Sequence, residues 1–148
     1  MVTLVARPGR RAELVTLDGA GSPVWRRPLP RGFWSGGVWG DLVVVQGADP
    51  AGGPMLRAFS LERGAAAWVI RASAAPARGA AARRTFGVGV EWGGALLVPA
   101  PNGLLRVDPA TGRTTRLDSA VPVDGLSTAA GLLLMRMGNA LLVVGDAT

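Results

Sequence analysis

The chain has 148 residues, a formal net charge of +6, 49% hydrophobic residues and 18% charged residues, a balance typical of one globular domain. It contains no Cys, His, Tyr or Lys, which excludes disulfides, thiolate chemistry, Ser-His-Asp relays, Schiff bases and Walker A phosphate binding. We therefore expect no catalytic residue, no cofactor and no metal site, and predict that the chain is not an enzyme.

All 16 basic residues are Arg, which indicates the codon bias of a GC-rich genome. They are scattered, and no recognition helix or aromatic RNA-binding strand accompanies them, so the sequence does not favour nucleic-acid binding. Apolar runs such as ALLVV are far shorter than the ~18 residues of a membrane span, so no transmembrane segment is predicted. A chain that begins here is expected to be cytoplasmic, and one with a truncated N-terminus to be in the cell envelope or secreted.

The first stretch predicts three strands and a turn. VTLVAR is the first recognisable strand, and LVTLDGAGSPVW (residues 14–25) gives a second strand, a corner at Asp18, a turn glycine at Gly21 and a strand that ends at Trp25.

The middle of the chain repeats this pattern. VWGDLVVV, around Trp39, predicts an inner hairpin, and LRAFSLERGAAAW (residues 56–68) has its corner at Ser60, its glycine at Gly64 and a strand that ends at Trp68. SAAPARGAAARR (residues 73–84) has neither strand nor helix periodicity and is predicted to be an inserted loop.

The third copy is the best preserved. EWGGALLV, around Trp92, predicts another inner hairpin, and LLRVDPATGRTT (residues 104–115) has its corner at Asp108 and its glycine at Gly112. The turn glycines of the three copies are 43 and 48 residues apart, a period typical of four-stranded propeller blades.

A fourth, unfinished copy closes the sequence. NALLVVGDAT (residues 139–148) superposes on NGLLRVDPAT (residues 102–111), so we expect the chain to end within a hairpin and to lack its last strand.

In every complete copy, two of the positions that precede the corner are apolar. One position before the corner stand Leu17, Phe59 and Val107, and four positions before it stand Leu14, Leu56 and Leu104. The two positions have opposite parity, so they point to opposite faces of a strand. This strand is therefore predicted to be covered on both faces, as between stacked blades.

A strand, Asp, a Thr-Gly turn and a strand with Trp together resemble the pyrroloquinoline-quinone-like (PQQ-like, WD40-like) β-propeller repeat. The resemblance implies an all-β fold of antiparallel four-stranded blades forming a partial PQQ-like β-propeller. It also implies that Asp18, Asp108 and Thr111 cap turns, and that Trp25 and Trp68 pack against neighbouring blades.

The predicted organisation is one partial propeller domain over residues 1–148. Its blades are expected at 1–31, 32–72, 85–118 and, incomplete, 121–148, with the loop at 73–84. Asp41, Glu91 and Asp124 lie near predicted strand starts but have no ligand spacing, so solvated turn carboxylates are expected rather than a calcium site.

The predicted function is a non-enzymatic binding or scaffold module that recognises a protein partner through its blade loops. Its candidate contact residues are Trp34, Arg78, Arg83 and Arg84. The alternative is the remnant of a quinoprotein-type propeller enzyme whose catalytic residues lie on missing blades. The uncovered blades imply either a piece of a longer repeat protein or a homodimer that completes the ring.

Overall fold

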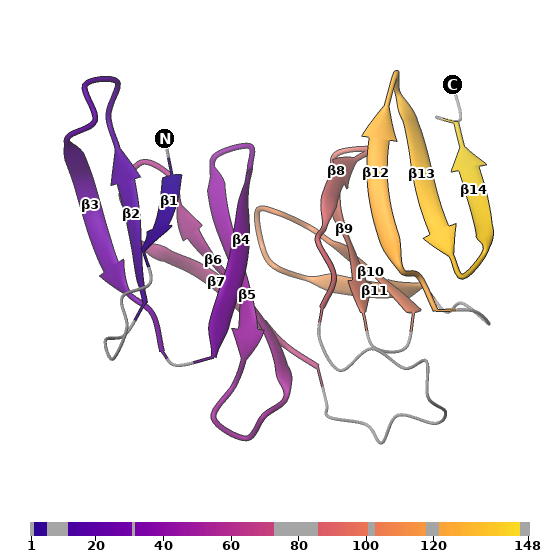
Figure 1. The fold of residues 1–148 in the computed structure, drawn as a ribbon, viewed down its shortest axis with the longest axis horizontal. Helices are drawn as coiled ribbons and strands as arrows, with labels where there is room; N and C mark the ends of the chain where they lie inside the picture. Colours follow the sequence, from indigo (N-terminus) through magenta and orange to yellow (C-terminus); the bar gives the residue numbers. More distant parts are fainter. Residues whose placement is uncertain are drawn as a thin grey trace. The chain divides into compact units, whose positions relative to one another are not determined.

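The computed structural model describes residues 2–5, 12–30, 32–72, 86–100, 103–117 and 122–145, with the backbone alone described at 2–5 and at Trp34. The chain divides into two compact units, Met1–Arg71 and Ala72–Thr148. Every strand pair in the described residues is antiparallel, and these residues form no helix (Figure 1).

Unit 1 contains two up-and-down sheets. Sheet 1 has the order β1 (Val2–Val5), β2 (Glu13–Leu17) and β3 (Pro23–Pro28). Sheet 2 has the order β4 (Phe33–Trp39), β5 (Leu42–Ala48), β6 (Pro54–Ser60) and β7 (Ala66–Arg71).

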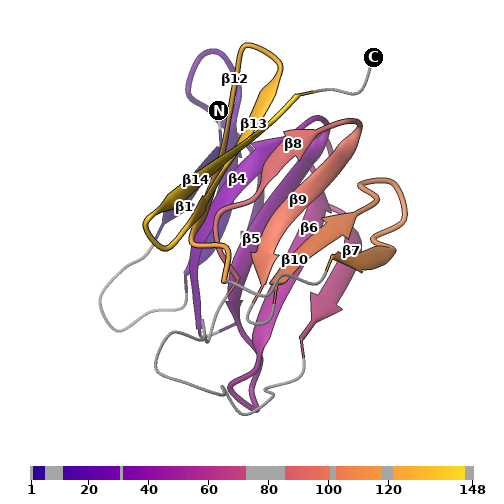
Figure 2. The ribbon, with the colours of Figure 1, turned by 90° about the vertical axis from the view of Figure 1, so that its right-hand side faces the viewer.

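Unit 2 repeats this construction. Sheet 3 has the order β8 (Val90–Trp92), β9 (Ala95–Ala100), β10 (Gly103–Val107) and β11 (Thr114–Leu117). Sheet 4 has the order β12 (Gly125–Ala129), β13 (Leu132–Met137) and β14 (Ala140–Val144), and Figure 2 shows it turned by 90°. The predicted all-β fold of antiparallel, blade-type sheets of up to four strands is confirmed.

The inner hairpins turn where the Trp-Gly pairs predict. Trp39 pairs with Leu42 and Trp92 pairs with Ala95, so each hairpin has a two-residue turn. In the second hairpin Gly93 and Gly94 both have positive φ, 57° and 67°, the conformation that two-residue turns require and that glycine adopts without a steric penalty.

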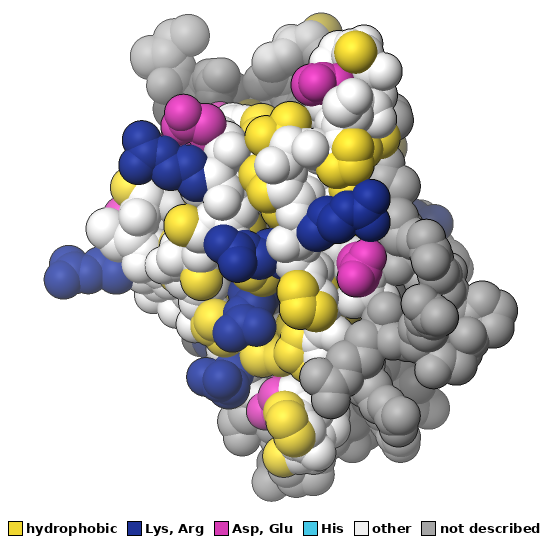
Figure 3. Space-filling view, turned by 90° about the vertical axis from the view of Figure 1, so that its left-hand side faces the viewer, with side chains coloured by type: hydrophobic (Ala, Val, Ile, Leu, Met, Phe, Trp, Pro, Cys, Tyr) yellow, Lys and Arg dark blue, Asp and Glu magenta, His cyan; other side chains and the backbone are white. Residues whose placement is uncertain are grey.

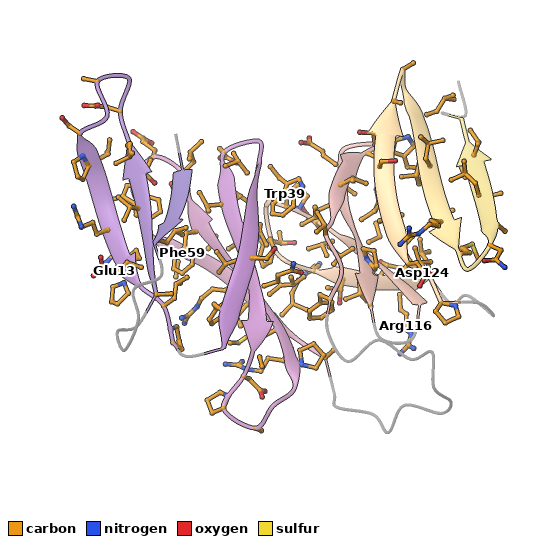
Figure 4. The ribbon with its side chains drawn as sticks, in the orientation of Figure 1. Glu13, Trp39, Phe59, Arg116 and Asp124 are labelled. Carbon is orange, nitrogen blue, oxygen red and sulfur yellow. The ribbon has the colours of Figure 1, made fainter. Side chains whose placement is uncertain are left out.

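Both faces of the corner strands are used in packing. In unit 1, Leu14 of sheet 1 and Phe59 of sheet 2 belong to one buried core, together with Val43, Val45 and Met55 (Figure 4 labels Phe59). In unit 2, Leu104 of sheet 3 packs in one cluster with Leu133 and Val144 of sheet 4. These clusters confirm that, within each unit, a neighbouring sheet covers one face of the corner strand. On the other face, Leu56 of β6 and Val107 of β10 are also buried.

Trp25 joins sheet 1 to sheet 2. Its indole Nε1 donates a 2.8 Å hydrogen bond to the Leu61 carbonyl, and Arg27 Nε donates another of 2.8 Å to the Gly64 carbonyl. Trp25 therefore packs on the corner turn of the neighbouring sheet, as predicted. The expectation that its strand ends at the tryptophan was wrong, because β3 continues to Pro28 and pairs Arg27 with Leu14.

Because Trp25 contacts one of the corner turns, alanine substitution of two equivalent turn glycines should lower the free energy of unfolding by different amounts. Gly21 and Gly64 both have positive φ, 81° and 63°, but a Cβ on Gly64 would lie 2.6 Å from Trp25 Cδ2, whereas one on Gly21 meets nothing within 4 Å. Gly21→Ala should cost about 1–2 kcal/mol through backbone strain alone. Gly64→Ala should cost roughly 1–3 kcal/mol more, because the indole must move and lose its hydrogen bond.

Urea unfolding of the two variants checks this prediction, since the midpoints at equal m-values compare their free energies of unfolding. Equal midpoints would show that the Trp25 contact does not hold the two sheets together.

Candidate functional site

The polar side chains at the corners hold backbone N–H groups. Asp18 Oδ1 accepts hydrogen bonds from the backbone N–H groups of Ala20, at 2.9 Å, and Ser22, at 2.8 Å. Asp108 Oδ1 accepts one from Ala110 N–H at 2.9 Å. Ser60 Oγ takes the same place in the second copy, where it accepts a 3.3 Å bond from Arg63 N–H. The predicted role of Asp108 as a turn cap is confirmed.

A fourth cap of this kind was missed in the sequence. Asp49 Oδ1 accepts a 2.8 Å hydrogen bond from Gly53 N–H in the turn between β5 and β6. The signal was available, since Asp49-Pro50-Ala51 repeats the Asp108-Pro109-Ala110 triplet. It lies outside the repeat register that identified the other corners, because it joins the second strand of a sheet to the third.

The three acidic residues near strand starts do not form a metal site. Asp124 Oδ2 accepts a 2.6 Å hydrogen bond from Gly138 N–H and so ties the start of β12 to the β13–β14 turn (Figure 4). Asp41 and Glu91 are exposed. In the described part of the chain, no three acidic side chains gather closely enough to hold a metal ion.

The corner turn at Asp108 changes the ionisation of this carboxyl group. The hydroxyl of Thr111 donates a 2.7 Å hydrogen bond to Asp108 Oδ2. This bond, with a smaller contribution from the Ala110 N–H, holds the pKa of Asp108 below its usual value. The ionised carboxylate is thus the form that the folded turn favours.

The hydrogen bond between Thr111 and Asp108 predicts that the free energy of unfolding falls at acid pH. A carboxyl with a lowered pKa in the folded state stabilises the fold above its unfolded pKa and loses that contribution as the pH falls through the folded value. Thr111→Val removes the main cause, so the pKa of Asp108 should rise toward that of a free aspartate and the acid loss of stability should begin at higher pH. A titration of Asp108 followed by NMR measures this pKa.

Thr115→Val is the matched control, because Thr115 is also exposed but lies on β11 away from the carboxylate. An unchanged Asp108 pKa in Thr111→Val would contradict the assignment.

The predicted contact residues fall outside what the structure describes. Arg78, Arg83 and Arg84 lie in the undescribed stretch from 73 to 85, as does the whole predicted loop, and Trp34 is described only by its backbone in β4. Their role stays a prediction. The structure neither gathers these residues into one site nor separates them.

Several described arginines make structural contacts. Figure 3, which looks at the β1–β3 side of unit 1, shows arginine side chains among apolar ones. Arg26 lies 3.7 Å from Glu13 in an exposed ion pair, a type that contributes little. Arg57 lies 5.8 Å from the Phe59 ring centroid. These contacts do not form a charged binding site.

The most unusual exposed surface is strand β14. Leu141, Leu142 and Val143 are 64%, 47% and 50% exposed, although consecutive strand residues point to opposite faces. β14 also lies at the edge of sheet 4, where its described hydrogen-bonding neighbour is β13 alone. Folded proteins usually protect such edges with charged residues or proline.

The other final strands carry this protection. β3 contains Arg26, Arg27 and two prolines, β7 contains Arg71, and β11 contains Arg116. β14 reads Ala-Leu-Leu-Val-Val and has neither charge nor proline. We take this strand as the candidate functional site. The fourth copy of the repeat predicted this strand, whereas the predicted contact residues were Trp34, Arg78, Arg83 and Arg84.

The fold and this strand define an all-β protein of repeated antiparallel sheets with an exposed apolar edge. No family model matches the sequence, and no curated protein matches it. Among solved structures, the chain is similar to the crystal structure of BamB from Moraxella catarrhalis, with 14% sequence identity and a TM-score of 0.47. The match covers 95% of this chain and 55% of that one, so the chain spans about half the length of the BamB chain. Within the described ranges, no helix is long and apolar enough to span a bilayer.

Proposed function

We propose that the chain is a non-enzymatic protein-interaction module, and that it binds a partner by adding one of the partner's strands to the free edge of β14. The observation that carries the proposal is the exposed, uncharged edge strand itself. An edge of this kind supplies a row of backbone donors and acceptors for affinity, and its alternating side chains supply specificity.

The repeat supports the direction of pairing. In sheets 2 and 3, a fourth strand lies antiparallel beside the strand that leads to the corner, as β7 does beside β6 and β11 beside β10. β14 is equivalent to β10, because Ala140–Val144 and Gly103–Val107 occupy matching positions of the repeat. In the described structure, the outer edge of β14 therefore corresponds to the edge at which β10 pairs with β11.

The polar chemistry supports a non-enzymatic role. The carboxylates of Asp18, Asp49, Asp108 and Asp124 each accept hydrogen bonds from turn backbone. A general acid or base must be free to exchange a proton with a substrate, and these groups are engaged in holding the fold.

Binding through the blade loops, with Arg78, Arg83 and Arg84 as contacts, is a second mode for the same module and uses a different surface. Deleting residues 73–84 would remove that mode and leave the β14 edge intact. The two modes are thus separable on one chain.

A synthetic peptide tests the edge. The fluorescently labelled peptide Gly-Ala-Ala-Ala-Trp-Val-Ile-Arg, which copies Gly64–Arg71 and so the fourth strand of sheet 2, should bind saturably in fluorescence anisotropy. A matched peptide with proline in place of Val69 lacks one ladder donor and should bind at least about tenfold more weakly.

Hydrogen exchange then locates the peptide. Bound peptide should slow amide exchange at Leu141–Val144 more than at the edge strands β1 and β8. Equal binding of the two peptides, or protection confined to another edge, would refute strand addition at β14.

A further inference from the structure

The hydrogen bonds of sheet 4 determine which backbone groups β14 presents at its outer edge. The Asp124 N–H donates a 2.7 Å hydrogen bond to the Arg136 carbonyl, so the backbone polar groups of Arg136 point toward β12. Arg136 pairs with Leu141 of β14, and this is therefore a non-hydrogen-bonded pair of the antiparallel ladder. Leu141, and by alternation Val143, direct their N–H and C=O groups away from β13, where an added strand would find them.

Arg136 places a positive charge on one face of this edge. Leu134 and Arg136 of β13 pair with Val143 and Leu141 of β14, and paired residues project their side chains from the same face. Arg136, Leu141 and Val143 are exposed, and Leu134 is half-buried. Among the described residues, no carboxylate forms an ion pair with Arg136. The face is thus apolar at Leu134 and Val143 and cationic beside Leu141.

Leu141 has a neighbour of a different kind from those of its counterparts. In sheets 2 and 3, the leucine four residues before the corner lies between two uncharged residues of the adjoining strands. The residues in these rows are Gln46, Leu56 and Ile70 in sheet 2, and Pro99, Leu104 and Leu117 in sheet 3. In sheet 4, Leu141 has the cation Arg136 on one side. A strand added on the other side therefore meets a charge that β7 and β11 do not meet at this position.

We propose that the strand added to β14 carries a carboxylate opposite Leu141 and an apolar residue opposite Val143. Because an antiparallel strand runs against β14, the acidic residue comes two positions after the apolar one in the partner's sequence. Neighbouring strands lie about 4.8 Å apart, so the carboxylate-bearing residue is roughly 10 Å from Arg136 between Cα atoms. The extended side chains of an arginine and a glutamate together span this gap alongside Leu141.

The inference rests on the proposed function, because it specifies the partner's chemistry at the same edge. It also distinguishes such a partner from a second copy of this chain that offers its own β14. That strand reads Ala-Leu-Leu-Val-Val and has no acidic residue, so self-pairing in any register would leave Arg136 without a carboxylate.

Two peptides that differ only in charge test the carboxylate. In Gly-Ala-Ala-Ala-Trp-Val-Ile-Arg, the seventh residue corresponds to Ile70, which pairs with Leu56 in sheet 2 and so corresponds to the residue opposite Leu141. The Ile70→Glu and Ile70→Gln peptides form a matched pair. In fluorescence anisotropy at low ionic strength, the Glu peptide should bind about two- to fivefold more tightly than the Gln peptide, and added salt should remove this preference.

Variants of the chain assign the preference to Arg136. In Arg136→Gln the two peptides should bind equally, and in Arg136→Glu a peptide with Lys at the seventh position should bind more tightly than the Glu peptide. Arg116→Gln is the control, because it removes the same charge from an exposed residue of β11 in the same unit, and it should keep the wild-type preference (Figure 4 labels Arg116). Circular dichroism checks that each variant is folded.

Moving the carboxylate by one residue tests the register. The sixth peptide residue, which corresponds to Val69, projects from the opposite face of an added strand. The affinity ratio of the Val69→Glu and Val69→Gln peptides should therefore be the same for the wild-type chain and for Arg136→Gln. A ratio that changes with Arg136 would contradict the proposed register.

The outcomes separate this inference from the proposed function. Glu and Gln peptides that bind the wild-type chain equally, or a Glu preference that persists in Arg136→Gln, would overturn the acidic strand and leave strand addition at β14 in place. Failure of every peptide to bind, the unmodified Gly64–Arg71 sequence included, would overturn both.

Discussion

The structure depends on one repeated arrangement, in which a leucine four residues before the corner of one sheet shares an apolar cluster with the residue directly before the corner of the next. Leu14 and Phe59 share one such cluster, and Leu104 and Val144 share the other. A sheet of three or four strands cannot bury both of its faces alone, so each sheet is stable only as part of a stack. This constraint explains why the corner strands are apolar on both faces.

The polar groups at the corners stabilise the same packing of sheets. Asp18, Ser60 and Asp108 hold their corners closed through bonds to backbone N–H groups, and Trp25 connects one sheet to the corner of another through the Leu61 carbonyl. Because these bonds hold the corner rigid, an indole from the adjoining sheet meets a hydrogen-bond acceptor in a fixed position. The side chains of Asp18, Ser60 and Asp108 therefore stabilise the scaffold.

Sheet 4 contains the surface on which the proposed function rests. In the described part of the chain, β13 is the one hydrogen-bonding neighbour of β14, and Leu141, Leu142 and Val143 are exposed. An edge of this kind offers backbone hydrogen bonds to an added strand. The strand that is proposed to bind a partner is thus also a strand of the repeat that builds the core.

The sequence by itself determined the strands, the corners and the two-faced burial pattern, because alternation, turn glycines and Asp caps act over a few residues and need no distant partner. It also predicted that Trp25 meets a neighbouring sheet, although it placed the strand end at that residue rather than at Pro28. Only the tertiary structure decided that Trp25 bonds the Leu61 carbonyl and that Leu141 is 64% exposed while Leu104 is 5% exposed. These two leucines occupy equivalent positions of the repeat, so their difference arises from the surrounding sheets, and burial is a property of that arrangement and not of the local pattern.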